Sequence, residues 1–398
     1  MSWPVVSFGD VAQFINGDRG KNYPSKGSFV DEGIPFINAG NLSLVHTIYA
    51  DALNYITEDK FNSLNSGKIE KGDILFCLRG SLGKFALVDS DMKGAIASSL
   101  VIIRVNEKIN IDYLKHYLGS FLCEREIQLY ENGAAQPNLS ATDLKTFQIP
   151  LPPLEEQKRI AAILDKADAI RQKRKQAINL ADEFLRSVFL DMFGDPVTNP
   201  KGWEVKKLKD LTSKLGSGST PRGGKEAYLS EGISLIRSLN VHDNSFVYKE
   251  LAFISDEQAE KLRNVVVKER DILLNITGAS VCRCAMVPSN VLPARVNQHV
   301  CIVRTDRKQL LPEFATRLLT STSFKQMMMS IATSGGATRE ALTKQQVENL
   351  SMIVPPMELQ KKFCALDRKL VGFETKSKQQ VSMPIFDALS QKAFSGQL

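Results

Sequence analysis

The sequence lacks the residue patterns that commonly carry out catalysis. The glycine-rich stretch 216–220 lacks the Lys-Ser/Thr ending of a nucleotide-binding P-loop. An amino-methyltransferase needs a glycine-rich cofactor loop and an Asn/Asp-Pro-Pro-aromatic motif, but both Pro-Pro pairs here are followed by Leu or Met. The four histidines lack metal-ligand spacing, and no Gly-x-Ser-x-Gly elbow occurs. The sequence therefore predicts a protein without catalytic residues, bound metal or cofactor of its own.

Polar side chains that suit base recognition precede a β-branched stretch in each half of the chain. Residues 94–99 read Gly-Ala-Ile-Ala-Ser-Ser, and residues 294–299 read Ala-Arg-Val-Asn-Gln-His. Asn and Gln bond adenine bidentately, and Arg bonds guanine. Positions that differ between similar flanks are therefore candidates for base readout. The alternative is that Asn297 and Gln298 satisfy the backbone of a turn.

Two loops combine glycine with Lys and Arg, which suits contact with phosphate groups. They span residues 19–26 and 222–225, and ordinary solvated loops are the alternative. The full set of candidate DNA-binding residues is Arg19, Lys21, Lys26, Arg79, Lys84, Ser98, Ser99, Gln136, Thr220, Arg222, Lys225, Arg237, Asn275, Thr277, Arg295, Asn297, Gln298, His299 and Arg339.

Two proline signatures introduce the elements that must position these residues. Residues 150–160 read PLPPLEEQKRI, and residues 354–363 read VPPMELQKKF. Proline suits the first turn of a helix, and the following glutamates suit the positive end of its dipole. Apolar residues then recur at helical spacing; in the first copy they are Ile160, Ile163, Ala167, Ile170, Ala177, Ala181, Phe184 and Val188. We predict a helix of about 60 Å over 154–193, at roughly 1.5 Å per residue.

The two halves share an order of segments, which indicates a tandem duplication. Trp3 corresponds to Trp203, and the strand 100–105 corresponds to 300–305. Lys-Gly-Asp-Ile-Leu at 71–75 matches Glu-Arg-Asp-Ile-Leu at 269–273. Each half reads as an α/β (α+β) domain closed by a long helix. Pro384 predicts a kink in the second helix, because an interior proline costs roughly 3 kcal/mol.

Composition and charge fit a globular protein with a polyanionic partner. The 398 residues suffice for two domains and connectors, and 43% of them are hydrophobic. Residues 196–353 carry 22 basic and 15 acidic side chains, whereas residues 1–153 carry 14 and 17. We expect reduced cysteines, no secretory leader, no membrane span and a cytoplasmic location.

The ordered set of motifs, present twice, resembles the specificity subunit of type I restriction–modification enzymes. It comprises the two proline signatures, the Asp-Ile-Leu strands, Gly-Ser-Thr-Pro at 218–221 and the Phe-Ser-Gly-Gln ending at 394–397. The resemblance implies target recognition domains at 1–152 and 195–354, and spacer helices at 153–194 and 355–398. It implies that the helices pack as an antiparallel coiled coil with pseudo-two-fold symmetry.

The resemblance also implies partners. Each domain would read one half of a split sequence in double-stranded DNA, while the helices set the spacer. Two modification subunits would supply methyl transfer with S-adenosylmethionine, and a restriction subunit would add translocation with ATP and Mg²⁺. Apolar helix residues are the candidate subunit interface: Phe184, Val188, Phe189, Met192, Phe386, Leu389 and Phe394.

Two other functions stay open at this point. The α/β domains could bind protein, which would make the chain a coiled-coil adaptor. The chain could also be a recognition-domain enzyme whose catalytic residues have no recognised motif. The basic cluster 171–175 on the first helix would face the DNA spacer or an acidic partner, or simply solvent.

Overall fold

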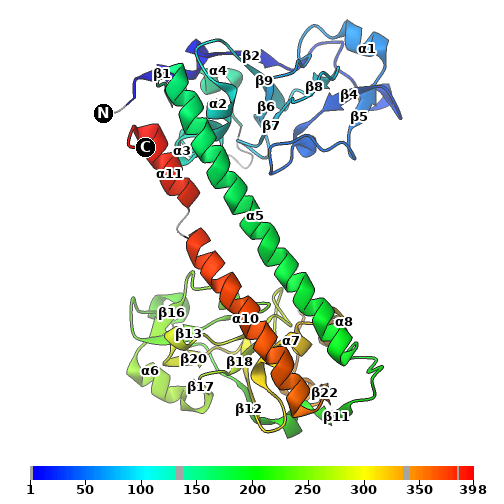
Figure 1. Cartoon of the computed structure of the whole chain (residues 1–398), viewed down its shortest axis with the longest axis vertical. Coiled ribbons are helices and arrows are strands. Elements are labelled where there is room, and N and C mark those ends of the chain that lie inside the picture. Colours follow the sequence, from blue (N-terminus) through cyan, green and yellow to red (C-terminus); the bar gives the residue numbers. More distant parts are fainter. Residues whose placement is uncertain (1–2, 131–137, 222, 335–339, 383–384) are drawn as a thin grey trace. The chain divides into compact units, whose positions relative to one another are not determined.

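The computed structural model describes residues 3–130, 138–221, 223–334, 340–382 and 385–398 of the chain. It contains two compact units (Figure 1). Unit 1 comprises Met1–Lys175 and Ser377–Leu398, and unit 2 comprises Gln176–Lys376. Each unit therefore holds one α/β domain together with parts of the long helices.

Unit 1 is built on two four-stranded sheets. The first has the order β2-β9-β6-β7 and is entirely antiparallel, and the second has the order β3-β5-β4-β8 with β4 and β8 parallel. A separate antiparallel pair joins β1 to β10. The strands are β1 (Val5–Ser7), β2 (Ala12–Asn16), β3 (Phe29–Val30), β4 (Ile34–Ile37), β5 (Asn54–Ile56), β6 (Ile74–Cys77), β7 (Phe85–Leu87), β8 (Ala95–Ile96), β9 (Leu100–Val105) and β10 (Gln148–Pro150).

Unit 2 repeats this plan. Its sheets have the orders β12-β21-β18-β19 and β16-β13-β20-β17, and β13 again runs parallel to β20. The pair β11–β22 matches β1–β10, and β14–β15 forms a short hairpin. The strands are β11 (Glu204–Lys207), β12 (Thr212–Ser217), β13 (Ile233–Ile236), β14 (Val241–His242), β15 (Ser245–Phe246), β16 (Ala252–Ile254), β17 (Val266–Val267), β18 (Ile272–Asn275), β19 (Cys284–Met286), β20 (Ala294–Val296), β21 (Val300–Thr305) and β22 (Ser351–Val354).

The helices complete each unit. Unit 1 contains α1 (Glu58–Ser63), α2 (Ile111–Leu118), α3 (Phe121–Gln128) and α4 (Ala141–Lys145), and unit 2 contains α6 (Asp256–Lys261), α7 (Pro312–Leu319), α8 (Thr322–Thr333) and α9 (Lys344–Glu348). The long helix α5 spans Leu154–Phe193, as the sequence predicts. Its counterpart consists of α10 (Met357–Ser382) and α11 (Ile385–Ser395). The kink predicted at Pro384 falls outside the described residues.

A buried ion pair explains the repeated Asp-Ile-Leu motif. In unit 1, Arg104 on β9 donates two hydrogen bonds of 2.8 Å to the carboxylate of Asp73. In unit 2, Arg304 on β21 donates two bonds of 2.7 Å to Asp271. Both carboxylates also accept the backbone N–H three residues before them, at 2.7 Å. The aspartate therefore fixes the turn before the strand and ties that strand to its neighbour, because bidentate Arg–carboxylate pairs are strong and directional.

A buried glutamine explains the rest of the proline signature. The side-chain Oε1 of Gln157 accepts the backbone N–H of Asn110 at 2.7 Å, and its Nε2 donates to the carbonyls of Lys108 and Pro152. Gln360 makes the matching bonds to the backbone of Leu311, Gln309 and Pro355. One side chain in each unit thus joins the start of the long helix to the loop before α2 or α7.

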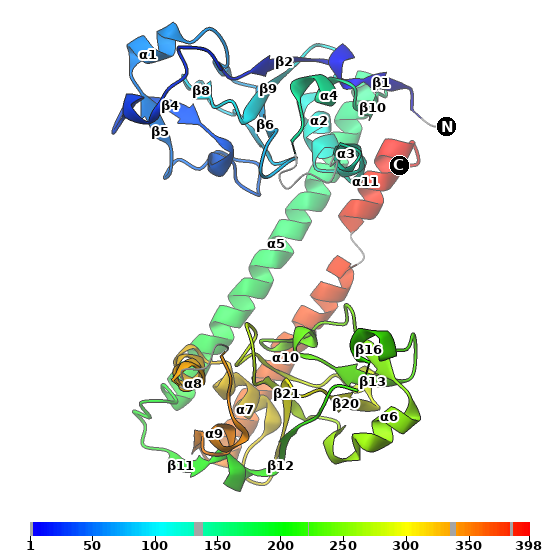
Figure 2. The same cartoon turned by 180° about the vertical axis from the view of Figure 1, so that it is seen from behind.

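Each α/β domain also packs against the end of a helix, which in unit 1 is remote in sequence. Figures 1 and 2 show α11 beside β1 and α2 in unit 1, where Phe394 packs against Tyr113 at a ring distance of 5.3 Å. The indole N–H of Trp3 donates to the carbonyl of Ala393 at 2.7 Å. In unit 2 the indole N–H of Trp203 donates to the carbonyl of Phe193, at the end of α5. The two tryptophans therefore hold equivalent helix ends.

The buried face of α5 differs from the predicted seam. Ile170 and Phe184, two of the predicted seam residues, are about half exposed. The buried positions include Ile160 and Ala181, which were predicted, and four residues outside the predicted seam: Leu164, Leu185, Phe189 and Phe193. The reason is that this face packs on the α/β domains within each unit, so a pattern for helix pairing alone selects the wrong positions.

The buried glutamines yield a stability prediction. Replacing Gln157 or Gln360 with Leu should lower the free energy of unfolding by about 2 kcal/mol or more, because one backbone N–H and two carbonyls lose their partners in a buried site. Gln345→Leu, at an exposed position on α9, serves as the control. The measurement is denaturant unfolding of the full chain, and equal stability of all three variants would contradict the assigned role.

Candidate nucleic-acid interface

A close backbone approach places the first loop of each unit. A Cβ atom added at Gly17 would lie 2.7 Å from the carbonyl oxygen of Ile96, and one added at Gly218 would overlap the carbonyl oxygen of Val296. Only glycine fits such positions without displacing backbone. Arg19 lies two residues after Gly17, and Thr220 lies two residues after Gly218. The close contacts therefore place these two residues beside the turns that precede β9 and β21.

In unit 2 these segments form a connected polar surface, which we call patch 2: Thr220, Thr277, Gln298 and His299. The hydroxyl of Thr220 bonds the side-chain oxygen of Gln298, whose Nε2 lies 3.2 Å from Nε2 of His299. The other ring nitrogen of His299 bonds the hydroxyl of Thr277. Gln298 is exposed and the other three side chains are half-buried. Patch 2 therefore presents hydrogen-bond donors and acceptors in a fixed arrangement.

The equivalent surface of unit 1, patch 1, comprises Arg19, Arg79, Ser98, Ser99 and Asn138. Arg19 donates to the carbonyl of Ser98 at 3.5 Å, and Nε of Arg79 donates to Oδ1 of Asn138 at 3.0 Å. Both arginines are exposed. Asn138 is absent from the sequence-based candidates because its contact spans 59 residues of sequence and no local pattern marks it.

Asp18 fixes the backbone that carries Arg19. Its carboxylate accepts the N–H groups of Asn65 and Gly20, each at 2.8 Å. These bonds favour the ionised form and lower the pKa of Asp18 below its usual value. The loop of patch 1 is therefore held at neutral pH by one local hydrogen bond and one to a distant segment.

Two predicted DNA-binding residues are buried and bonded within unit 2, so the prediction is corrected for them. Asn275 is fully buried and donates to the carbonyl of Ser238 at 2.8 Å. Asn297 is 4% exposed and accepts the N–H of His299, which confirms the alternative of a satisfied turn for this residue. Arg295 is half-buried and donates to the carbonyl of Ala259 in α6, and its contact with DNA stays a prediction. The bond from the N–H of His299 to Asn297 helps to hold patch 2.

The remaining candidates are placed as follows. Lys21 is exposed and Lys84 is half-buried. Arg237 lies over the ring of Tyr228 at 5.2 Å and donates to the carbonyl of Glu250. Gln136, Arg222 and Arg339 lie outside the described residues, as do the side chains of Lys26 and Lys225.

The predicted subunit-interface residues separate into two classes. Phe189 is 3% exposed and Phe394 is 4% exposed, and both belong to hydrophobic cores within their units, so the expectation that they face partners is corrected. Val188, Met192, Phe386 and Leu389 pack partly against the same cores. Phe184 and Ile170 of α5 are each 52% exposed, and Leu180 of the same helix is 63% exposed. These three side chains form exposed apolar surface along the middle of α5, and Leu154 and Leu190 are also exposed near its ends.

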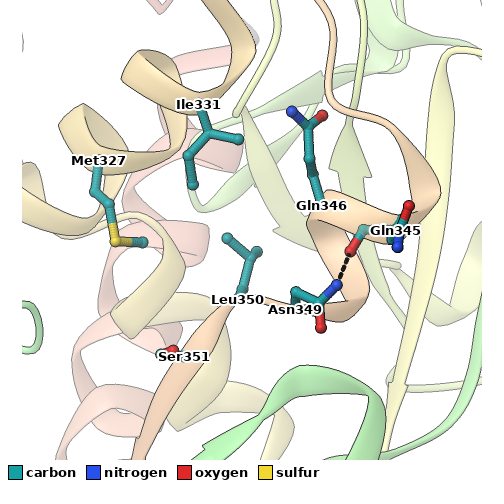
Figure 3. A pocket seen from close by; sticks show the side chains of 7 residues that line it. All are labelled: Met327, Ile331, Gln345, Gln346, Asn349, Leu350 and Ser351. Carbon is teal, nitrogen blue, oxygen red and sulfur yellow. Dashed lines mark hydrogen bonds between the residues drawn. The ribbon is translucent and has the colours of Figure 1, made fainter. Parts of the chain in front are cut away.

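Unit 2 also contains a pocket of about 330 Å³ between α8, α9 and β22 (Figure 3). Met327, Ile331 and Leu350 supply its apolar wall, while Gln345, Gln346, Asn349 and Ser351 supply its polar groups. Its lining contains no titratable side chain. The part of the chain described here also contains no cluster of metal-binding side chains. Within the same residues, no helix is long and apolar enough to cross a membrane.

Two copies of one α/β domain, each attached to a long helix and each presenting its own polar surface, define a two-site recognition protein. A family model described as the type I restriction modification DNA specificity domain matches residues 2–180 and 200–381. The chain therefore belongs to the type I restriction–modification specificity family and carries its domain twice. This family is the non-catalytic, DNA-recognising part of restriction–modification complexes, which confirms the predicted class.

Individual relatives agree with this assignment. A putative type I restriction enzyme MjaX specificity subunit of Methanocaldococcus jannaschii is 24% identical, over 95% of this chain and 90% of the relative. The EcoKI specificity subunit of Escherichia coli is 21% identical, over 100% and 89%. A crystal structure of the S subunit from M. genitalium has the same fold, with a TM-score of 0.57, 16% identity and coverage of 99% and 96%.

The two classes of helix residue yield a second prediction. Phe189→Ser should lower the free energy of unfolding by about 3–5 kcal/mol, because it removes a buried ring stacked on Phe314 at 5.6 Å. Phe184→Ser should change it by less than about 0.5 kcal/mol, because the ring is exposed. Denaturant unfolding of the full chain measures both. Equal destabilisation by the two substitutions would contradict the assignment of Phe189 to the core.

Proposed function

We propose that each α/β domain binds duplex DNA through its own patch and reads one half of a split target sequence. One observation carries this proposal. Patches 1 and 2 occupy the same backbone positions in the two units, yet one presents arginine and serine while the other presents Gln, His and Thr. A constant frame with different donors and acceptors is what two readers of different half-sites require.

We also propose that the long helices set the distance between the half-sites and receive the partner subunits. The exposed apolar side chains Ile170, Leu180 and Phe184 on α5 support docking of modification subunits, of which we propose two. These subunits would transfer the methyl group from S-adenosylmethionine, and a restriction subunit would add ATP-dependent cleavage. The assembled complex would act in the cytoplasm, where it meets chromosomal and incoming DNA.

The test is to co-express the full chain with its modification subunits and to map methylated positions by sequencing. A split motif that disappears when this chain is omitted is the expected result. Binding to duplex DNA should weaken steeply with salt, because phosphate contacts release counterions. A protein adaptor would show neither the motif nor the salt dependence. Methylation by the purified chain alone would show that the chain is itself an enzyme.

Independent readout by the two units predicts modular specificity. Replacing residues 3–145 with the matching domain of another specificity subunit should change one half of the methylated motif. Replacing residues 203–348 should change the other half. Methylation mapping of both chimaeras provides the measurement, and each chimaera is the control for the other. A chimaera whose motif changed in both halves, or in neither, would reject independent readout.

A helical spacer predicts that helix length controls the gap between half-sites. Seven residues add about 10 Å to a helix at roughly 1.5 Å per residue, which corresponds to about three base pairs. Inserting one heptad after Ala177 and another after Gln379 should widen the gap by about three base pairs while both half-sites stay the same. The rotation by about a third of a DNA turn is expected to lower activity.

The measurement is methylation mapping of the double insertion. Insertions of two residues at the same two positions serve as controls, because they rotate the helix faces and should abolish methylation. An active heptad variant that kept the original gap would show that the helices do not set the distance.

A further inference from the structure

Arg79 and Thr277 occupy one structural position in the two units. The residue before each, Leu78 or Ile276, donates its N–H to the carbonyl of Ser99 or His299, both at 2.9 Å. Arg79 forms an antiparallel bridge with Asn138, and Thr277 forms the same bridge with Ala341. The backbone hydrogen bond and the β-bridge thus match in the two units, so the side chains at this position are directly comparable.

The two side chains at this position present different chemistry. The hydroxyl of Thr277 is bonded to Nδ1 of His299 within patch 2. Arg79 is exposed, and its Nε is bonded to Oδ1 of Asn138 at 3.0 Å. That bond engages Nε and leaves the two terminal nitrogens to other partners. Asn138 is neutral, so the arginine keeps its full positive charge.

A fixed guanidinium plane matters for bases more than for phosphates. Contact with a phosphate needs positive charge near the backbone, which mobile Lys or Arg side chains supply. Guanine presents two acceptors, O6 and N7, in the major groove, and the two terminal nitrogens of an oriented arginine match them with two parallel hydrogen bonds. Because Asn138 bonds only Nε of Arg79, both terminal nitrogens can form such a pair.

We propose that Arg79, oriented by Asn138, is a specificity-determining residue that reads one guanine in the half-site of unit 1. The proposal rests on the proposed function, because it names the base contact made by patch 1. Thr277 and its bonded His299 present no guanidinium at the equivalent position of unit 2. The two half-sites therefore differ at the equivalent base pair.

The experiment uses the full chain with its co-expressed modification subunits and maps methylation for wild type and three variants. In Arg79→Ala, one guanine of one half-site should become degenerate, with discrimination at that position falling by about 5- to 100-fold, which is the range for one bidentate pair. All other positions of the motif should stay as in wild type. Asn138→Ala should relax the same position to a smaller degree, because the arginine remains but its plane is free.

Thr277→Ala is the matched control at the equivalent position of unit 2. Any change that it causes should fall in the other half-site. Unfolding curves of all variants show whether the chain remains folded, and Asn138→Ala decides the outcome if Arg79→Ala does not fold, because it leaves Arg79 in place.

Three outcomes would overturn the assignment of Arg79. The unit 1 half-site could contain no guanine; Arg79→Ala could keep the wild-type motif with weaker and less salt-sensitive binding, which marks a phosphate contact; or the changed position could lie in the half-site of unit 2. A wild-type complex that methylates no split motif is a different result, because it would overturn the proposed function itself.

Discussion

Both domains depend on a buried amide at the start of a long helix. Gln157 and Gln360 each satisfy backbone groups from two segments, the proline turn that begins the helix and the loop before α2 or α7. A buried backbone group without a partner costs about 1–3 kcal/mol, so neither segment can shift without losing several bonds together. The direction in which each helix leaves its domain is therefore set by a side chain, and a polar residue is retained in the core for that reason.

The same logic separates the constant part of each domain from its variable part. The Asp73–Arg104 and Asp271–Arg304 pairs and the close approaches at Gly17 and Gly218 are repeated in both units. They fix strands and loops by ion pairing and by backbone contact, which tolerate few residue types. The side chains of patches 1 and 2, by contrast, differ between the two units. Such a division lets a recognition surface change its donors and acceptors while the fold beneath it stays the same.

The way each domain is closed also limits what the helices can offer to partners. α5 contributes its first part to the core of unit 1 and its last part to the core of unit 2, where Phe189 and Phe193 pack against Phe363 of α10 at 5.5 and 5.6 Å. α11 takes the corresponding place in unit 1 through Phe386 and Phe394. Many large apolar residues of these helices are therefore buried within the two units. Ile170, Leu180 and Phe184 remain exposed along the middle of α5, as do Leu154 and Leu190 near its ends.

The sequence by itself determined the duplication, the bounds of α5 and of the strands β9 and β21, and the absence of catalytic motifs, because local periodicity, proline placement and residue spacing carry that information. The tertiary structure alone decided which polar residues are free to bind. The sequence predicts that Asn275 and Asn297 read bases, yet both side chains are buried and hydrogen-bonded to backbone groups. Asn138 looks ordinary, yet the fold brings it to Arg79 across 59 residues. Helical spacing likewise could not distinguish Phe184 from Phe189, because the partner surface that buries one of them comes from distant strands and helices.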